Sequence, residues 1–331
     1  MTSPNVSANP VDLAAAVRRG ERAAIASALN LLDDKREHSR QGAAHLLNEL
    51  QRTIAATDSK LIGITGPPGA GKSSLTAALI SHWRQGDLSV GVLAVDPSSP
   101  ISGGALLGDR LRMKTSSEDE GVFVRSLACR GEFGGLSAEV WPMSLVMMAA
   151  FDITLIETVG VGQREIDVSQ LCDTTCYVAQ PGSGDSVQFL KAGILEVPHI
   201  LVVNKEDMGE VARRTLAELS TALCREHPDG QWQVPVLSVS ATLNSGIDTL
   251  AAKLQEHHLH LVSNNRLNKR RLAYQSTWVG KRLRGEFGSN GIDQLGGEQQ
   301  LATLLNNSES AVLEQYESLR QQLLANPKTT F

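Results

Sequence analysis

The chain has 331 residues, a formal net charge of −5, 41% hydrophobic residues and 20% charged residues. These values are ordinary for a soluble globular protein with about two domains, or with one large α/β domain and appendages. There is no basic stripe that would indicate nucleic-acid binding. No apolar run approaches the roughly 18 residues that a membrane span needs, and no secretory signal is visible, so we expect a cytoplasmic protein.

The cysteines support a reducing compartment. Cys129, Cys172, Cys176 and Cys224 form no C-x-x-C pair, which favours free thiols. Cys172 and Cys176 could be two ligands of a metal site, but Cys176 begins an apolar strand. We favour buried structural thiols, since free cysteine is among the most buried residue types.

The N-terminal part of the chain is predicted to be helical. Residues 1–10 are predicted to be a disordered tail, and residues 11–57 a helical extension packed on the domain that follows. Apolar positions at helical spacing predict one or two helices up to Leu32 and another from Ala43 to Ile54, separated by Gly20 and by the polar run 33–41. A membrane-surface role is a weaker alternative, because the polar faces mix both charge signs.

Residues 58–260 alternate between strand and helix patterns. Several strands are continuous apolar runs, which predicts an α/β class, doubly wound, mostly parallel sheet with helices on both faces. Ligands of such sheets bind outside the carboxyl ends of the strands. The strands are expected at 60–65, 89–95, 121–125, 152–157, 174–179, 198–203 and 234–239, and the helices at 72–85, 137–150, 164–171, 186–195, 209–226 and 246–258.

The C-terminal part, residues 261–331, is again helical in composition. Leucines from Leu301 to Leu323 recur at helical spacing, which predicts an arm that docks on the molecule or serves for dimerisation. The run His257-His258-Leu259-His260 could be a metal site. No carboxylate or cysteine cluster accompanies it, so a solvated helix end is favoured.

The glycine-rich segment after the first strand matches the phosphate-binding pattern G-x-x-x-x-G-K-[ST] and lies between a strand and a helix, as a P-loop requires. Glycines let backbone N–H groups turn toward phosphate oxygens, and the helix N-terminus favours an anion. Lys72 would reach the β- and γ-phosphates, and the Ser73 hydroxyl would bind Mg²⁺. The predicted nucleotide contacts here are Gly66, Pro67, Pro68, Gly69, Ala70, Gly71, Lys72, Ser73 and Ser74.

Two acidic residues follow further strands. Asp96 closes the second strand, where a carboxylate would meet Mg²⁺ directly or through water, although an Asp before proline is also common in turns. Glu157 ends the strand Ile153–Ile156 and is followed by Gly160, which resembles a Walker B segment. Glu157 would hold a metal-bound water, and the Gly160 N–H would sense the γ-phosphate. The segment 97–108 between them is rich in Gly, Ser and Pro, as in nucleotide-dependent switches, and leads to Asp109.

Asn204-Lys205-Glu206-Asp207 follows an apolar strand and matches the guanine-reading pattern N-K-x-D. Asp207 can accept two hydrogen bonds from guanine that adenine cannot supply, so ATP would be a poor ligand. Asn204 would brace the loops and Lys205 would lie along the base. Ser240-Ala241, after the last strand, fits the final contact to the guanine O6 atom.

Together these motifs resemble the MeaB/ArgK family of GTPases associated with methylmalonyl-CoA mutase. The resemblance covers roughly residues 11–260. It rests on Asp96-Pro97-Ser98-Ser99-Pro100, Gly103-Gly104, Gly108-Asp109-Arg110, Glu157 to Gln163, Gln180 to Asp185 and Asn204 to Asp207.

The resemblance implies slow, Mg²⁺-dependent GTP hydrolysis by a chaperone that gates adenosylcobalamin loading of an acyl-CoA mutase and protects that enzyme. It also implies a homodimer through the C-terminal arm. Lys72, Asp96, Asp109 and Glu157 would form the catalytic set, with Ser73, Asp96, Asp109 and Glu157 toward the metal. The loop 180–191 resembles the segment that couples nucleotide state to the mutase.

The sequence departs from the family pattern at Glu132, Phe133 and Arg164, which concerns the choice of mutase partner. No arginine finger is evident, and Arg110, Arg125, Arg130 and Arg164 are only candidates. Three other classes stay open, one of them a nucleotide-gated binding module with no useful turnover. A metallocentre-maturation GTPase would carry Cys/His clusters, and a kinase of a small molecule or transport protein would need an acceptor site and a base near the γ-phosphate.

Overall fold

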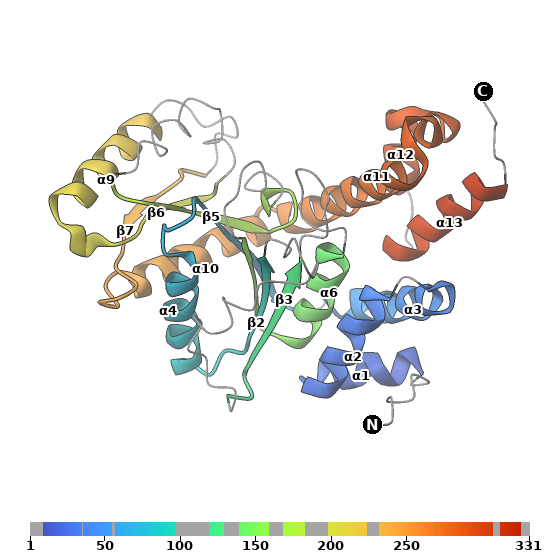
Figure 1. Cartoon of the computed structure of the whole chain (residues 1–331), viewed down its shortest axis with the longest axis horizontal. Helices are drawn as coiled ribbons and strands as arrows, with labels where there is room; N and C mark the ends of the chain where they lie inside the picture. The colour runs from blue at the N-terminus through green and yellow to red at the C-terminus, as the bar shows by residue number, and fades with distance from the viewer. Residues whose placement is uncertain are drawn as a thin grey trace, which may run out of the picture. The chain divides into compact units, whose positions relative to one another are not determined.

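The computed structural model describes residues 9–34, 36–54, 57–96, 119–128, 139–158, 168–182, 198–223, 232–306 and 312–325. The chain divides into two compact units, coloured by residue number in Figure 1. One unit, Lys60–Ser137 with Phe151–Leu267, contains the sheet. The other, Met1–Ser59 with Ala138–Ala150 and Asn268–Phe331, is helical in its described residues.

The sheet has seven strands in the order β3-β2-β4-β1-β5-β6-β7, and every neighbouring pair is parallel. This confirms the predicted fold class. All the strands expected from the apolar runs are present, and β3 continues past the predicted end at residue 125. Their bounds are β1 Lys60–Thr65, β2 Val90–Asp96, β3 Val122–Ala128, β4 Ile153–Thr158, β5 Thr174–Ala179, β6 Ile200–Val203 and β7 Val236–Ser238.

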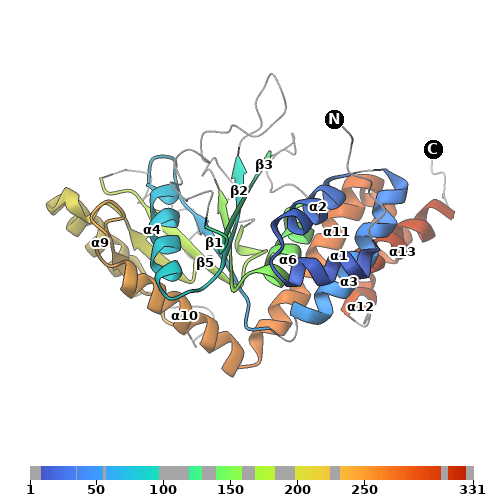
Figure 2. The ribbon, with the colours of Figure 1, turned by 90° about the horizontal axis from the view of Figure 1, so that it is seen from below.

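The two faces of the sheet can be followed from the alternation of side chains along a strand. On β5, Cys176 and Val178 belong to a core cluster with α4 (Lys72–Gln85) and α10 (Ile247–Ser263), two helices that contact each other and are neighbours in Figure 2. Tyr177 and Ala179 point the other way, into a cluster with α9 (Glu210–Leu223). Helices therefore cover both faces of this part of the sheet, as the apolar strands predict.

The parallel order brings the carboxyl ends of the strands to one edge. Since β1 lies between β4 and β5, the loop after β1 has the ends of both strands as neighbours. The segment after β6 begins a short 3₁₀ helix, η2 (Glu206–Met208). The described parts of all the predicted motifs follow these strand ends and lie in the same unit.

In the helical unit, α3 packs against α1, α2, α6 and α13. The predicted N-terminal extension and C-terminal arm thus fall within one unit, together with α6 from the middle of the chain. Ten of the eleven residues of α6 are buried. This agrees with its sequence, because a helix with apolar residues on all sides is typically buried. The helices are α1 Pro10–Arg18, α2 Arg22–Asp33, α3 Glu37–Ile54, α6 Val140–Ala150, α11 Arg266–Gln294 (whose first two residues belong to the other unit), α12 Gly297–Asn306 and α13 Val312–Ala325.

Some predicted helix bounds differ from the structure. The Asn9 side chain caps α1, which begins inside the predicted tail at Pro10. The polar run expected to separate helices up to residue 41 is helical from Glu37 onward, because polar residues are tolerated on the exposed side of an amphipathic helix. The helices predicted over 164–171 and 186–195 lie mostly or entirely outside the described residues.

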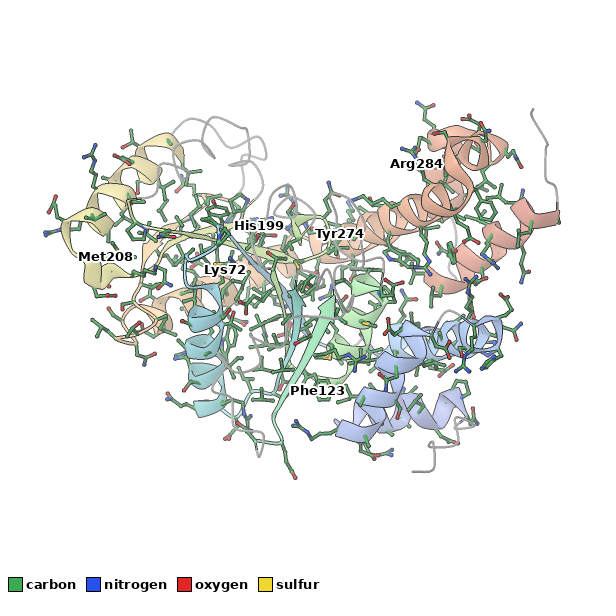
Figure 3. The ribbon with its side chains drawn as sticks, in the orientation of Figure 1. Lys72, Phe123, His199, Met208, Tyr274 and Arg284 are labelled. Carbon is green, nitrogen blue, oxygen red and sulfur yellow. The ribbon has the colours of Figure 1, made fainter. Side chains whose placement is uncertain are left out.

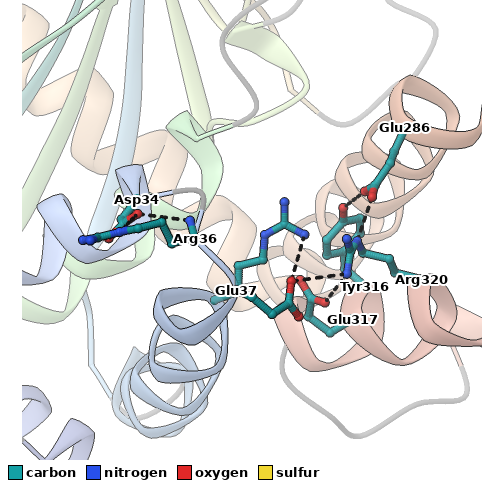
Figure 4. A network of polar contacts seen from close by, with 8 residues as sticks. Asp34, Arg36, Glu37, Glu286, Tyr316, Glu317 and Arg320 are labelled. Atoms are coloured by element: carbon teal, nitrogen blue, oxygen red, sulfur yellow. Dashed lines mark hydrogen bonds and ion pairs between the residues drawn. The ribbon is translucent and has the colours of Figure 1, made fainter. Parts of the chain in front are cut away.

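A polar network joins α3, α11 and α13 within the helical unit (Figure 4). Tyr316 donates a hydrogen bond to Glu286, and Arg320 Nε donates to Glu286 Oε1 at 2.7 Å. Arg320 also lies 3.5 Å from Glu317 and 3.9 Å from Glu37. Burial and the bond to Glu286 raise the pKa of Tyr316 to about 12. Burial opposes ionisation of Glu286, but the bonds from Tyr316 and Arg320 hold its pKa below the ordinary value.

The histidine run near the end of α10 is not a solvated helix end, so that prediction is wrong for two of its residues. His257 and His258 are each only 1% exposed. The His257 ring hydrogen-bonds to Thr174 Oγ1 at 2.8 Å and packs against the rings of His199 and Trp232. Its partners come from β5 and from segments far away in the sequence.

The described cysteines agree with the prediction of structural thiols. Cys172 and Cys176 are buried thiols that form no disulfide, and burial raises the pKa of both, that of Cys176 to about 12. Among the described residues, none of the helices is both long and apolar enough to cross a membrane.

Candidate nucleotide site

The loop between β1 and α4 has the close backbone approaches that its glycines permit. Gly66 has φ of 140°, and a Cβ there would lie 2.2 Å from the Val178 carbonyl oxygen on β5. Gly71 has φ of 88°, and a Cβ there would lie 2.5 Å from Asn204 Nδ2. Both positions therefore require glycine for conformation and for space.

Lys72, at the start of α4, is held inside this loop (labelled in Figure 3). The side chain is 7% exposed, and Nζ donates hydrogen bonds to the Gly66 carbonyl at 2.8 Å and to the Pro67 carbonyl at 3.0 Å. A buried ammonium needs such acceptors. The loop thus places a positive charge beside the N-terminus of a helix, an arrangement that attracts phosphate.

Ser73 and Glu157 meet at the carboxyl edge of the sheet. Ser73 Oγ donates to Glu157 Oε1 at 2.5 Å, and Glu157 is 3% exposed at the end of β4. A hydroxyl and a carboxylate are hard oxygen donors of the kind that Mg²⁺ prefers. This pair fits the predicted metal-binding role of both residues.

Asn204 joins the predicted base-reading segment to the phosphate loop. It is 2% exposed, and Nδ2 donates to the carbonyls of Ala70 at 2.9 Å and Gly71 at 3.3 Å. Lys205, with φ of 61°, extends along the loop and donates from Nζ to the Gly69 carbonyl at 2.8 Å. The two neighbouring side chains therefore hold three consecutive carbonyls of the loop.

The carboxylate of Asp207, which is predicted to read the base, is held by the segment after β7. Ser240 Oγ donates to Asp207 Oδ1 at 2.6 Å and accepts a bond from the Leu243 N–H at 3.2 Å. The N–H of Ala241, in the Ser240-Ala241 pair expected to contact guanine O6, donates to Asn204 Oδ1 at 3.2 Å. The structure thus brings Asn204, Asp207, Ser240 and Ala241 together around one place.

Thr215 of α9 contacts the segment that follows β5, and no sequence motif indicates this contact. Its hydroxyl oxygen accepts a hydrogen bond from the Gly182 N–H at 3.2 Å, just after Gln180. A threonine inside a helix pattern carries no signal of such a contact, because Gly182 lies 33 residues away.

Several predicted residues cannot be placed. Asp109, Gly160 and three arginine-finger candidates, Arg110, Arg130 and Arg164, lie outside the described residues, and so does the side chain of Asp96. Arg125 is described, on β3. Within the described ranges, no group of three or more His, Cys, Asp or Glu residues could hold a metal ion.

The comparisons with known proteins agree on one family. The family model described as "Methylmalonyl Co-A mutase-associated GTPase MeaB" matches residues 25–290. A protein of Pyrococcus abyssi named as a GTPase is 42% identical over 262 residues, 77% of this chain and 78% of its own. GTPase ArgK of Escherichia coli is 33% identical over 286 residues, 84% of this chain and 86% of its own.

A eukaryotic relative and a solved structure extend the similarity. The mitochondrial methylmalonic aciduria type A homolog of Caenorhabditis elegans is 32% identical over 281 residues, 81% of this chain and 70% of its own. The crystal structure of a LAO/AO transport system kinase superposes with a TM-score of 0.71 at 26% identity, covering 96% of this chain and all of that one.

Proposed function

Because the chain belongs to the MeaB family of P-loop GTPases, we propose that it is a Mg²⁺-dependent GTP-hydrolysing chaperone for an adenosylcobalamin-dependent acyl-CoA mutase. In this proposal it gates cofactor loading of an enzyme such as methylmalonyl-CoA mutase and protects it from inactivation. The name of the matched family and that of the C. elegans relative support this choice of partner. A homodimer through residues 261–331 and a cytoplasmic location belong to the same proposal.

One observation carries the nucleotide part of the proposal. The guanine-reading segment is attached directly to the phosphate loop, through Asn204 to Ala70 and Gly71 and through Lys205 to Gly69. A nucleotide whose base reached Asp207 would therefore have its phosphates placed at Lys72. Asp207, held by a hydrogen bond from Ser240, would supply the carboxylate acceptors that distinguish guanine from adenine.

Hydrolysis would depend on positioning and charge, as phosphoryl transfer does in general. Lys72 would exchange its bonds to the Gly66 and Pro67 carbonyls for phosphate oxygens. Ser73 and Glu157 would hold Mg²⁺, with Asp96 and Asp109 as the further predicted metal ligands. When bound, the metal would neutralise charge on the β- and γ-phosphate oxygens.

The test is GTP turnover by the purified protein with Mg²⁺, alone and with an adenosylcobalamin-dependent mutase from the same cell. ATP is the substrate control, and Lys72→Ala gives the baseline for contaminating activity. We expect slow release of free phosphate from GTP that rises when the mutase is added. GTP turnover that no such mutase changes would contradict the chaperone role, and transfer of phosphate to a protein or small molecule would indicate a kinase.

Asp207→Asn tests the guanine assignment. The amide keeps the size of the side chain but replaces one acceptor oxygen by a donor, and a hydrogen bond to a charged group contributes about 1.5–3 kcal/mol. We therefore expect the preference for GTP over ATP, measured as the ratio of kcat/KM values, to fall by about 10- to 100-fold. An unchanged ratio would show that Asp207 does not read the base.

A further inference from the structure

The segment that leaves β5 runs along the phosphate loop. The Val178 backbone lies against Gly66, where an added Cβ would come within 2.2 Å of its carbonyl oxygen. Two residues later, Gln180 Oε1 lies 3.1 Å from the position that a Cβ on Gly69 would take. The Gly69 carbonyl is bound by Lys205. Gly69 therefore lies between a lysine of the base-reading segment and a glutamine of the segment after β5.

Gly182, just beyond Gln180, rests on the first turns of α9. Its N–H donates to Thr215 Oγ1 at 3.2 Å, and the Thr215 hydroxyl donates in turn to the Val211 carbonyl at 3.1 Å. The Thr215 side chain is buried, at 5% exposure. Gly182 has φ of 71°, and a Cβ there would lie 2.9 Å from Val211 Cγ1. The backbone of Gly182 thus fits against α9 both by a hydrogen bond and by shape.

Helix α9 is also the continuation of the base-reading segment. Asp207 lies in η2, and Gly209, with φ of 64°, connects η2 to α9. A hydrogen bond from Gly182 to α9 therefore ties the exit of β5 to the element that follows the guanine-reading residues. We propose that Thr215 is a positioning residue of the GTPase site, whose hydroxyl holds Gly182 and thereby keeps Gln180 over Gly69 of the phosphate loop.

This role differs from that of a threonine that only supports its helix. The bond from Thr215 to Val211 is local to α9, whereas the bond from Gly182 links two elements of the site. Thr215→Val keeps the shape of the side chain but removes both bonds. A phosphate loop that is held less firmly spends less time in its binding conformation, and apparent affinity falls with that fraction.

The test measures GDP affinity by titration and the kcat and KM for GTP, with ATP as control, for Thr215→Val and Thr215→Ser. We expect Thr215→Val to weaken GDP binding by about five- to tenfold, the size of one net hydrogen bond. The preference for GTP over ATP should persist, because Asp207 and Ser240 are untouched. Thr215→Ser keeps the hydroxyl and should restore most of the loss. Wild-type affinity in Thr215→Val, or equal impairment in both variants, would overturn the proposal.

Thr221 provides a matched control on the same helix. Its hydroxyl donates to the Ala217 carbonyl at 2.8 Å, so Thr221→Val removes the same kind of local bond. Thr221 is exposed and lies more than one helical turn after Thr215, toward the C-terminal end of α9. Thr221→Val should bind GDP and hydrolyse GTP as the wild type does, and a loss equal to that of Thr215→Val would overturn the positioning role.

Gln180→Ala tests whether Thr215 acts through the glutamine. Gln180→Ala alone should weaken GDP binding to a similar degree, and the double variant should be no weaker than the weaker single variant, because both act on one contact. Additive losses would show that the two residues act independently and would overturn the proposed linkage. If Thr215→Val does not fold, Gln180→Ala alone still tests the proposal. Wild-type GDP affinity in Gln180→Ala would then overturn the proposed link between Thr215 and the phosphate loop.

Discussion

Asn204→Ala is expected to destabilise the nucleotide-free protein strongly. The side chain makes three bonds to backbone groups, two through Nδ2 to Ala70 and Gly71 and one through Oδ1 from Ala241, at 2.9, 3.3 and 3.2 Å. It is 2% exposed, so water does not replace these partners easily. At about 0.5–1.5 kcal/mol net for each bond, the free energy of unfolding should fall by about 2–4 kcal/mol.

The assay is urea-induced unfolding followed by far-ultraviolet circular dichroism, without nucleotide, because a bound ligand adds its own stabilisation. With a urea slope of about 3 kcal/mol per molar, the midpoint of the transition should fall by about 1 M. Asn204→Asp sharpens the test. It keeps the acceptor for Ala241 but turns an oxygen toward the Ala70 and Gly71 carbonyls, so it should be at least as destabilising as alanine.

Asn264→Ala is the matched control. Asn264 also donates from Nδ2 to a carbonyl, that of His260 at 2.8 Å, but it does so on an exposed helix end. A surface substitution of this kind should change the free energy of unfolding by no more than about 0.5 kcal/mol. The urea midpoint of Asn204→Ala or Asn204→Asp could equal that of the wild type, or be no lower than that of Asn264→Ala. Either result would refute the argument that the three Asn204 hydrogen bonds stabilise the protein.

Two further substitutions test other parts of the molecule. Gly66→Ala should lower the free energy of unfolding by more than about 3 kcal/mol in the same urea assay, because it adds strain at φ of 140° and places a Cβ 2.2 Å from the Val178 oxygen. Gly285→Ala, on α11 with no atom within 4 Å of the added Cβ, should be neutral or stabilising, and equal losses in both would contradict the steric argument. Glu286→Gln should lower stability at pH 7. Since the folded-state pKa of Glu286 is depressed, its contribution is present above the ordinary value of 4.5 and is lost as the pH falls through the folded-state value. The stability difference from wild type in urea titrations should therefore shrink below about pH 4.5, and a difference that stays constant with pH would count against the network.

The sheet could be predicted well because its strands carry their own signal. Strands buried on both faces are continuous apolar runs, so β1 and β5 begin and end where the sequence predicts. The sequence also assigns the phosphate loop and the base-reading segment by particular residue types at short spacing, and these assignments stay predictions. The structure adds that these two segments are bonded to one another, which no local pattern contains.

The errors concern residues whose environment is made by distant segments. His257 and His258 look like a polar helix end, yet the partners of His257 are Thr174, His199 and Trp232 from other elements. The polar stretch before residue 41 resembles a linker, whereas the structure places Glu37 in α3 near Arg320 of α13. Thr215 gave no signal for the same reason. Whether a residue is buried, and which residues it contacts, depends on the tertiary structure. The chemical type of the residue alone does not predict either.

The bonds of Asn204 also fix the orientation of peptide planes. In a planar trans peptide the carbonyl and the following N–H point in opposite directions. Asn204 draws the Ala70 and Gly71 carbonyls toward itself, so the N–H groups of Gly71 and Lys72 must face the opposite side, away from the base-reading segment. In the proposed site, a residue of the predicted base-reading motif would thus orient the backbone donors that face the phosphates. An attempt to redesign base preference would therefore have to leave Asn204 in place, or it would alter phosphate recognition at the same time.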